Sequence, residues 1–141
     1  MVSKVLICFG TRPEWLKVKP LVETLDDCKL LFTGQHKDLL ADIKVDYRIE
    51  IGEKTNRLDQ IISDCLLQFP EGDFDTVLVH GDTVSALACA LAAFSRKKRI
   101  VHLEAGLRSH DLRQPYPEEG YRQMISRIAD IKNVGGRTAG S

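Results

Sequence analysis

The chain has 141 residues, a hydrophobic content of 43%, and 20 basic against 20 acidic side chains, so its formal net charge is zero. This length suffices for one domain with a complete core. A zero net charge argues against a general attraction to nucleic acid or to an anionic membrane, and no apolar stretch approaches the roughly 20 residues of a membrane span. Four scattered cysteines without zinc-ligand spacing predict reduced core thiols in a cytoplasmic protein.

The first segments alternate between apolar strands and amphipathic helices. Residues 5–9 predict a strand, and the helix after it has Thr11 as its expected cap and Pro13 in its first turn. Pro20 lies inside the helical pattern and predicts a kink or a broken turn. The next expected elements are a strand, a short helix and a half-exposed strand, over residues 30–33, 39–43 and 47–51.

The same alternation continues to residue 131. The expected elements are helix, strand, helix, strand and helix, over residues 58–69, 77–80, 84–94, 100–103 and 118–128. Strands that alternate with helices favour an α/β fold with a parallel sheet and right-handed crossovers. We expect one domain over residues 1–131, and the Gly-rich residues 132–141 predict a disordered or artificially added tail.

Polar clusters follow three of the apolar strands, over residues 10–14, 80–83 and 104–108. Parallel strands of one sheet end at the same edge, and an open α/β sheet binds its ligand outside the carboxyl ends of its strands. We therefore expect these clusters to face one ligand.

The first cluster contains cationic side chains beside a helix start. Arg12 and Lys17 could hold a phosphate there, because free backbone N–H groups and the helix dipole also favour an anion. A surface ion pair of either residue with Glu14 is the alternative.

Three carboxylates form a second group, namely Asp82, Glu104 and Glu118. Carboxylates that share a cleft shift one another's pKa and can serve as general acid and base. Each also has a structural alternative: a helix cap for Asp82, an ion pair with Arg108 for Glu104, and a favourable helix-dipole contact for Glu118.

The histidines suggest no metal site. His102 lies in an apolar strand and is expected to be a hydrogen-bonded core residue, whereas His36 and His80 lie at strand ends. None of them has the spacing of a zinc-binding motif.

Together these motifs resemble the N-terminal half of the non-hydrolysing UDP-N-acetylglucosamine 2-epimerases. The matching stretches are residues 9–14 with Lys17 and Pro20, residues 33–36, 80–83 and 104–108, and residues 117–119 with Arg122. Their order and spacing extend from Lys4 to Asp130.

The resemblance implies two Rossmann-like domains in a glycosyltransferase-B-like architecture, of which this chain is the first: a Rossmann-like open parallel sheet with helices on both faces. It implies interconversion of UDP-GlcNAc and UDP-ManNAc by elimination and re-addition of UDP, with no metal and no nicotinamide cofactor. Carried over by position, the catalytic residues are Asp82, Glu104 and Glu118. The substrate-binding residues are Arg12, Lys17, Gln35, His36 and Arg122.

The chain also departs from the family. It ends after one domain, whereas the missing C-terminal domain would carry most uridine contacts and a further active-site histidine, and Tyr121 stands where an Asn is usual. We expect the isolated chain to be inactive. Its expected partners are UDP-GlcNAc, UDP-ManNAc, the missing Rossmann-like domain and a second copy in a homodimer. Two alternatives stay open: one half of a split nucleotide-sugar glycosyltransferase, and a non-catalytic nucleotide-sugar-binding module.

Overall fold

A computed structural model describes residues 4–34, 43–51, 57–103, 113, 116–134 and 137–140. Its strands form one seven-stranded sheet in the order β3-β2-β1-β4-β5-β6-β7. The strands are β1 (Val5–Phe9), β2 (Cys28–Phe32), β3 (Tyr47–Arg48), β4 (Thr76–His80), β5 (Arg99–Leu103), β6 (Ile131–Val134) and β7 (Arg137–Gly140). The pairs among β1 to β6 are parallel, and β7 runs antiparallel to β6.

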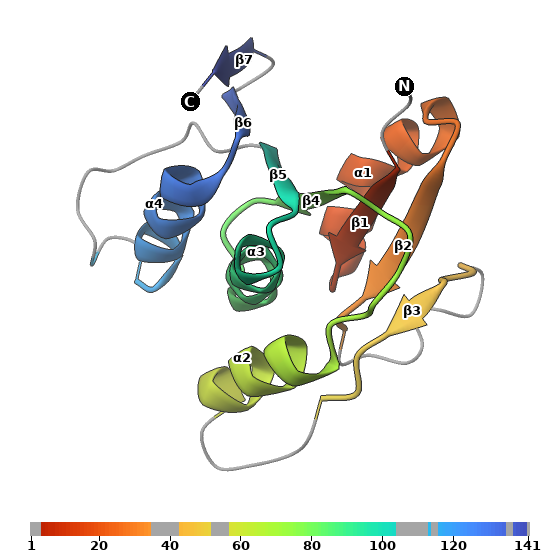
Figure 1. The fold of residues 1–141 in the computed structure, drawn as a ribbon. Coiled ribbons are helices and arrows are strands. Elements are labelled where there is room, and N and C mark those ends of the chain that lie inside the picture. The colour runs from red at the N-terminus through yellow and green to blue at the C-terminus, as the bar shows by residue number, and fades with distance from the viewer. Residues whose placement is uncertain are drawn as a thin grey trace.

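Helices cover both faces of this sheet (Figure 1). They are α1 (Arg12–Thr24), α2 (Arg57–Gln68), α3 (Val84–Ser95) and α4 (Glu118–Ile128). α3 packs between α2 and α4 on one face, and α1 packs on the other. The expected fold class, a Rossmann-like open parallel sheet with helices on both faces, is confirmed.

Alternation along β1 divides the core into two layers. Leu6 and Cys8 point toward α2 and α3, whereas Ile7 and Phe9 point toward α1, where they meet Val18. All five residues of β1 are buried, as a strand covered on both faces requires. Cys8, Cys65 and Cys89 are buried free thiols and Cys28 is a partly exposed one, which agrees with the expectation of reduced cysteines.

The strand order reverses between β1 and β4. From β1 the chain first builds outward through β2 and β3, and then returns to the other side of β1 with β4 and β5. Such a switch point leaves a crevice at the carboxyl ends of the two central strands, where doubly wound sheets bind their ligands. The topology therefore places the candidate site beyond Phe9 and His80.

Several local expectations differ from the structure. α1 continues through Pro20 to Thr24, so the broken turn expected at the proline is absent, whereas the alternative of a kink stays a prediction. β3 ends at Arg48, so the expected strand over residues 47–51 is shorter than its alternating pattern suggested. Residues 39–42 of the expected short helix lie outside the described residues, and Ile43 is not helical.

The segment expected to be a disordered tail contains strands. β6 extends beyond Ile131 to Val134, and β7 pairs with it from Arg137 to Gly140. Backbone hydrogen bonds along the edge of an existing sheet need no apolar pattern in the added strand, which explains why composition alone did not predict them. None of the helices in the described part of the chain combines the length and the apolar character that a membrane span requires.

Candidate active site

A small pocket of about 200 Å³ lies at the switch point of the sheet. Its rim includes the two residues that cap the adjoining helices: Thr11 accepts from the backbone N–H of Glu14 at the start of α1, and Thr83 accepts from that of Ala86 at the start of α3. The lining residues are Gly10, Thr11, Glu14, Thr33, Gly34, Ile61, Thr83, Val84 and Ser85. Two helix N-termini therefore open onto one cavity.

Glycines allow the strand ends to turn into this pocket. A Cβ on Gly10 would lie only 2.6 Å from Thr33 Oγ1, so the loop after β1 approaches the end of β2 more closely than a larger residue permits. Gly81, after β4, has a φ of +77°, a conformation that residues with a side chain rarely adopt. The two turns therefore depend on glycine for different reasons.

The carboxylate of Asp82 forms an ion pair with the Arg122 guanidinium, which comes from α4. Arg122 Nη1 also donates to Glu119 Oε1 at 3.3 Å, and Glu119 is fully buried. Arg122 thus bridges the end of β4 and the first turn of α4. Thr83 rather than Asp82 caps α3, so the helix-cap alternative for Asp82 is wrong.

Glu14 is a buried carboxylate and not a surface residue. It is 6% exposed, and its Oε1 accepts hydrogen bonds from Gly10 N–H at 3.1 Å and Thr11 Oγ1 at 3.0 Å. Burial raises the pKa of its carboxyl above the ordinary value, although these hydrogen bonds act in the opposite direction. The N–H of Gly10, which could have received a phosphate, is therefore already used by the protein itself.

The two described histidines of the sheet are both buried. His102 has its Nε2 2.7 Å from the Gly81 carbonyl oxygen and its Nδ1 3.3 Å from Ser126 Oγ. Because a carbonyl can only accept, Nε2 carries the proton. His102 is thus the hydrogen-bonded core residue that the sequence predicted, and it supports the Gly81 turn.

The other predicted site residues divide into two groups. Arg12 and Lys17 are exposed on the first two turns of α1, and Glu118 is half-buried in the first turn of α4. Gln35, His36 and Glu104 lie outside the described residues, as does Arg108. The structure therefore brings Asp82 and Arg122 into direct contact, and places Arg12 at the end of the neighbouring strand.

Sequence reasoning missed the two most buried carboxylates near this edge, Glu14 and Glu119. A signal was present for Glu14, because Thr11 and Glu14 have the spacing of a capping box. Glu119 gives a weaker signal, since only its three-residue separation from Arg122 suggests a helical ion pair.

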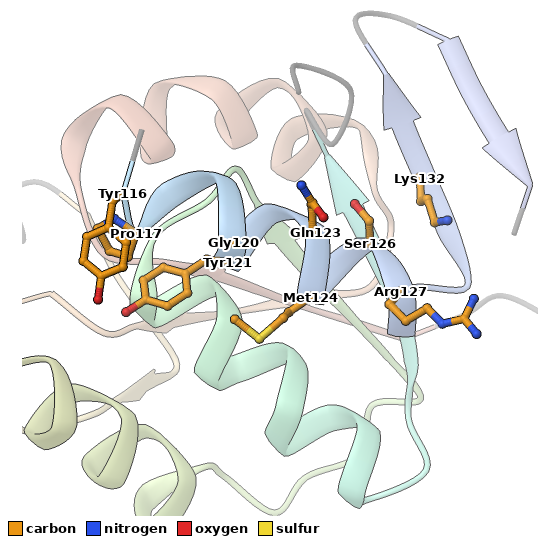
Figure 2. Close-up of a pocket in the computed structure, with 9 residues that line it drawn as sticks. All are labelled: Tyr116, Pro117, Gly120, Tyr121, Gln123, Met124, Ser126, Arg127 and Lys132. Carbon is orange, nitrogen blue, oxygen red and sulfur yellow. The ribbon is translucent and has the colours of Figure 1, made fainter. Parts of the chain in front are cut away.

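A larger cavity of about 790 Å³ lies along α4, away from the switch point. In Figure 2 the rings of Tyr116 and Tyr121 lie at one end of it, and Arg127 and Lys132 lie at the other. It shares no lining residue with the smaller pocket and contains no carboxylate. The lining of this cavity includes none of the predicted acid–base carboxylates, whereas Asp82 follows β4 at the switch point, so we place the candidate active site there despite its smaller volume.

Metal binding has no support in the described part of the chain. No three or more His, Cys, Asp and Glu side chains there form a group that could hold a metal ion. At the switch point Asp82 is paired with Arg122, and Glu14 accepts from backbone and hydroxyl donors.

The fold and the site together define a Rossmann-like α/β domain with its polar groups gathered at the switch point. The sequence profile of the UDP-N-acetylglucosamine 2-epimerase family matches residues 22–139, so the chain belongs to that family. A UDP-N-acetylglucosamine 2-epimerase of Campylobacter jejuni is 42% identical over an alignment that covers 93% of this chain and 38% of the relative. One of Bacillus subtilis (strain 168) is 39% identical, with 91% and 38% covered.

The solved structures agree with this assignment. The crystal structure of UDP-GlcNAc 2-epimerase from Neisseria meningitidis bound to UDP-GlcNAc superimposes with a TM-score of 0.85 at 34% identity. The superposition covers 93% of this chain and 39% of that one. The chain therefore spans about two fifths of the length of the relatives it matches.

Proposed function

We propose that the chain is the N-terminal, substrate-binding domain of a non-hydrolysing UDP-GlcNAc 2-epimerase. The observation that carries the proposal is the ion pair of Asp82 with Arg122 at the switch point, in a family with a member solved with UDP-GlcNAc bound. It unites a candidate acid–base group and a candidate phosphate contact that are 40 residues apart in the sequence.

The proposed reaction needs both kinds of group. A base removes the proton from C2 of the sugar while the C1–O bond breaks, which releases UDP and leaves 2-acetamidoglucal. UDP then adds back to C1 as C2 receives a proton on the opposite face, giving UDP-ManNAc. Carboxylates supply the proton transfers, and cations stabilise the negative charge on the leaving diphosphate.

The proposed roles are those that the resemblance implies for each position. Asp82, Glu104 and Glu118 are the acid–base candidates, and the cations Arg12, Lys17 and Arg122 are the diphosphate contacts. The Nε of Arg122 supports its assignment, because it is buried and has no hydrogen-bond acceptor among the described residues. Part of the hydrogen-bonding capacity of this guanidinium is therefore unused within the described part of the chain. Gln35 and His36 are proposed as further substrate contacts.

The remaining proposals concern the whole protein. Since the chain spans 38% of the Campylobacter jejuni relative, we propose that a second Rossmann-like domain completes the site. A homodimer and a cytoplasmic location are further proposals, and they rest on the resemblance alone.

A titration with UDP-GlcNAc tests the proposal through the backbone amide spectrum of the 141-residue chain. We expect weak binding with shifts confined to residues 10–17, 35–36, 81–83, 104–108 and 118–122, and no UDP-ManNAc formed above background. Asp82→Asn should weaken binding, whereas Asp26→Asn, which changes an exposed residue, should not. Shifts elsewhere, or equal effects of the two variants, would refute the site. Transfer of the sugar to an acceptor would favour the split glycosyltransferase instead.

A further inference from the structure

The carboxylate of Glu14 fixes the loop between β1 and α1. Its Oε1 accepts from Gly10 N–H and from the Thr11 hydroxyl. In return Thr11 Oγ1 accepts from the backbone N–H of Glu14 at 3.3 Å. This is a capping box in which the carboxylate reaches one residue further back than usual. The loop that leads into Arg12, the first residue of α1, is therefore fixed by hydrogen bonds at Gly10 and Thr11.

The second oxygen of the same carboxylate reaches a different part of the chain. Thr83 Oγ1 lies 3.5 Å from Glu14 Oε2, although the two residues are 69 positions apart. The Thr83 hydroxyl also caps α3 by accepting from Ala86 N–H at 3.1 Å. Asp82 directly precedes Thr83, so Glu14 connects the loop that carries Arg12 to the loop that carries Asp82.

The surroundings of the Glu14 carboxylate help to stabilise a negative charge on it. The N-termini of α1 and α3 both direct the positive ends of their dipoles toward it. Among the titratable groups that face it, His80 at the end of β4 favours the carboxylate form, while the buried thiol of Cys89 on α3 is neutral, since its pKa is raised. Burial nevertheless raises the pKa of Glu14, so the charge is held at a cost in stability.

We propose that Glu14 is a positioning residue that holds the Arg12 loop against the Asp82 loop, and so sets the spacing of the two side chains at the ligand edge. Its carboxyl group satisfies Gly10 N–H and both capping hydroxyls. An anionic ligand is then received by the side chains of Arg12 and Lys17 rather than by the backbone of the β1–α1 loop. The ligand's identity rests on the proposed function, but the link between the loops does not.

This link, the coupling of the Arg12 loop to the Asp82 loop through Glu14, can be measured without any ligand. Amide spectra of the complete 141-residue chain, recorded from pH 4 to 8, should show the Gly10 and Ala86 signals moving with one common midpoint, above the ordinary Glu value of 4.5. Glu14→Gln keeps the size of the side chain and should abolish this titration at both positions. Glu23→Gln, which alters an exposed residue of the same helix, should leave it intact.

The outcomes are decisive for the link. Loss of the common midpoint in Glu14→Gln, with shifts in both loops at constant pH, would support the positioning role. If Ala86 does not titrate with Gly10, or if the titration persists in Glu14→Gln, the carboxylate does not couple the loops and the proposal is wrong.

A ligand titration separates this inference from the proposed function. At pH 7 we expect Glu14→Gln to weaken UDP-GlcNAc binding by about tenfold, and Glu23→Gln to leave it unchanged. If the unaltered chain does not bind UDP-GlcNAc, the proposed function fails, while the amide titration still decides the link. If Glu14→Gln removes the common titration but binds UDP-GlcNAc as tightly as the unaltered chain, Glu14 links the loops without positioning the site, and the inference fails.

Discussion

Arg122 of α4 is ion-paired with Asp82, the second residue after β4, and the same guanidinium binds Glu119 one turn earlier on its own helix. The side chain of Arg122 is 14% exposed and that of Asp82 is 24% exposed. This bridge explains how the helix after β5 is held beside the switch point. It also unites two predicted site residues that are 40 positions apart in the sequence.

Removing Arg122 should destabilise the chain strongly. Arg122→Ala leaves the partly buried Asp82 and the fully buried Glu119 without their common cation, which should lower the free energy of unfolding by about 3 kcal/mol. Arg127→Ala removes an exposed cation of the same helix and should change it by about 0.5 kcal/mol at most. Urea denaturation of the variants measures both values. Equal losses would mean that the ion pair does not form in solution.

Thr83 should contribute to the stability of the chain through its hydroxyl group. Thr83→Ala removes the cap of α3 and one donor to Glu14. The free energy of unfolding should therefore fall by about 1 kcal/mol. Thr83→Ser keeps the hydroxyl and should recover most of it. Thr24→Ala, in the exposed last turn of α1, is the matched control and should have little effect on the thermal midpoint. A destabilised Ser variant would show that the methyl group rather than the cap matters.

The two glycines at the strand ends should respond differently to alanine. Gly10→Ala places a Cβ against Thr33 Oγ1 and should cost about 2 kcal/mol. Gly81→Ala meets no atom within 4 Å but forces a positive φ, which should cost about 1 kcal/mol. Adding Thr33→Ala should relieve only the Gly10 variant, and a double-mutant cycle measures this coupling. Coupling with Gly81→Ala would contradict the steric account.

Much of the fold could be predicted because its signals are local. Apolar runs such as residues 77–79 are typical of strands buried on both faces, and the alternation of strands with helices predicts the parallel sheet. The capping role of Thr11 also followed from its neighbours in the sequence. These features depend on a few adjacent residues, so the rest of the fold does not change them.

The contacts that build the site could not be predicted in the same way. Asp82 and Arg122 meet only because α4 returns to the carboxyl end of β4, and Glu14 reaches Thr83 only because β1 and β4 are neighbours in the sheet. Sequence spacing gives neither distance. The hairpin of β6 and β7 was missed for a related reason, since edge pairing uses backbone groups that every sequence possesses.

The buried charge of Glu14 should make the stability of the chain depend on pH. Its folded-state pKa is raised above the ordinary value of 4.5 by burial, so the folded state binds the proton more tightly than the unfolded state does. Glu14 therefore lowers the free energy of unfolding as the pH rises from about 4.5 through the raised pKa.

Glu14→Gln has no such titration. The curves of unfolding free energy against pH for this variant and for the unaltered chain should therefore coincide near pH 4 and diverge above it, with the variant more stable at pH 7. Glu23→Gln should follow the unaltered chain throughout. Urea denaturation from pH 4 to 8 measures the difference, and parallel curves for Glu14→Gln and the unaltered chain would show that the buried carboxylate carries no cost. A variant that gains stability while it loses ligand affinity would indicate a charge retained for function, because stability and activity often oppose each other at such sites.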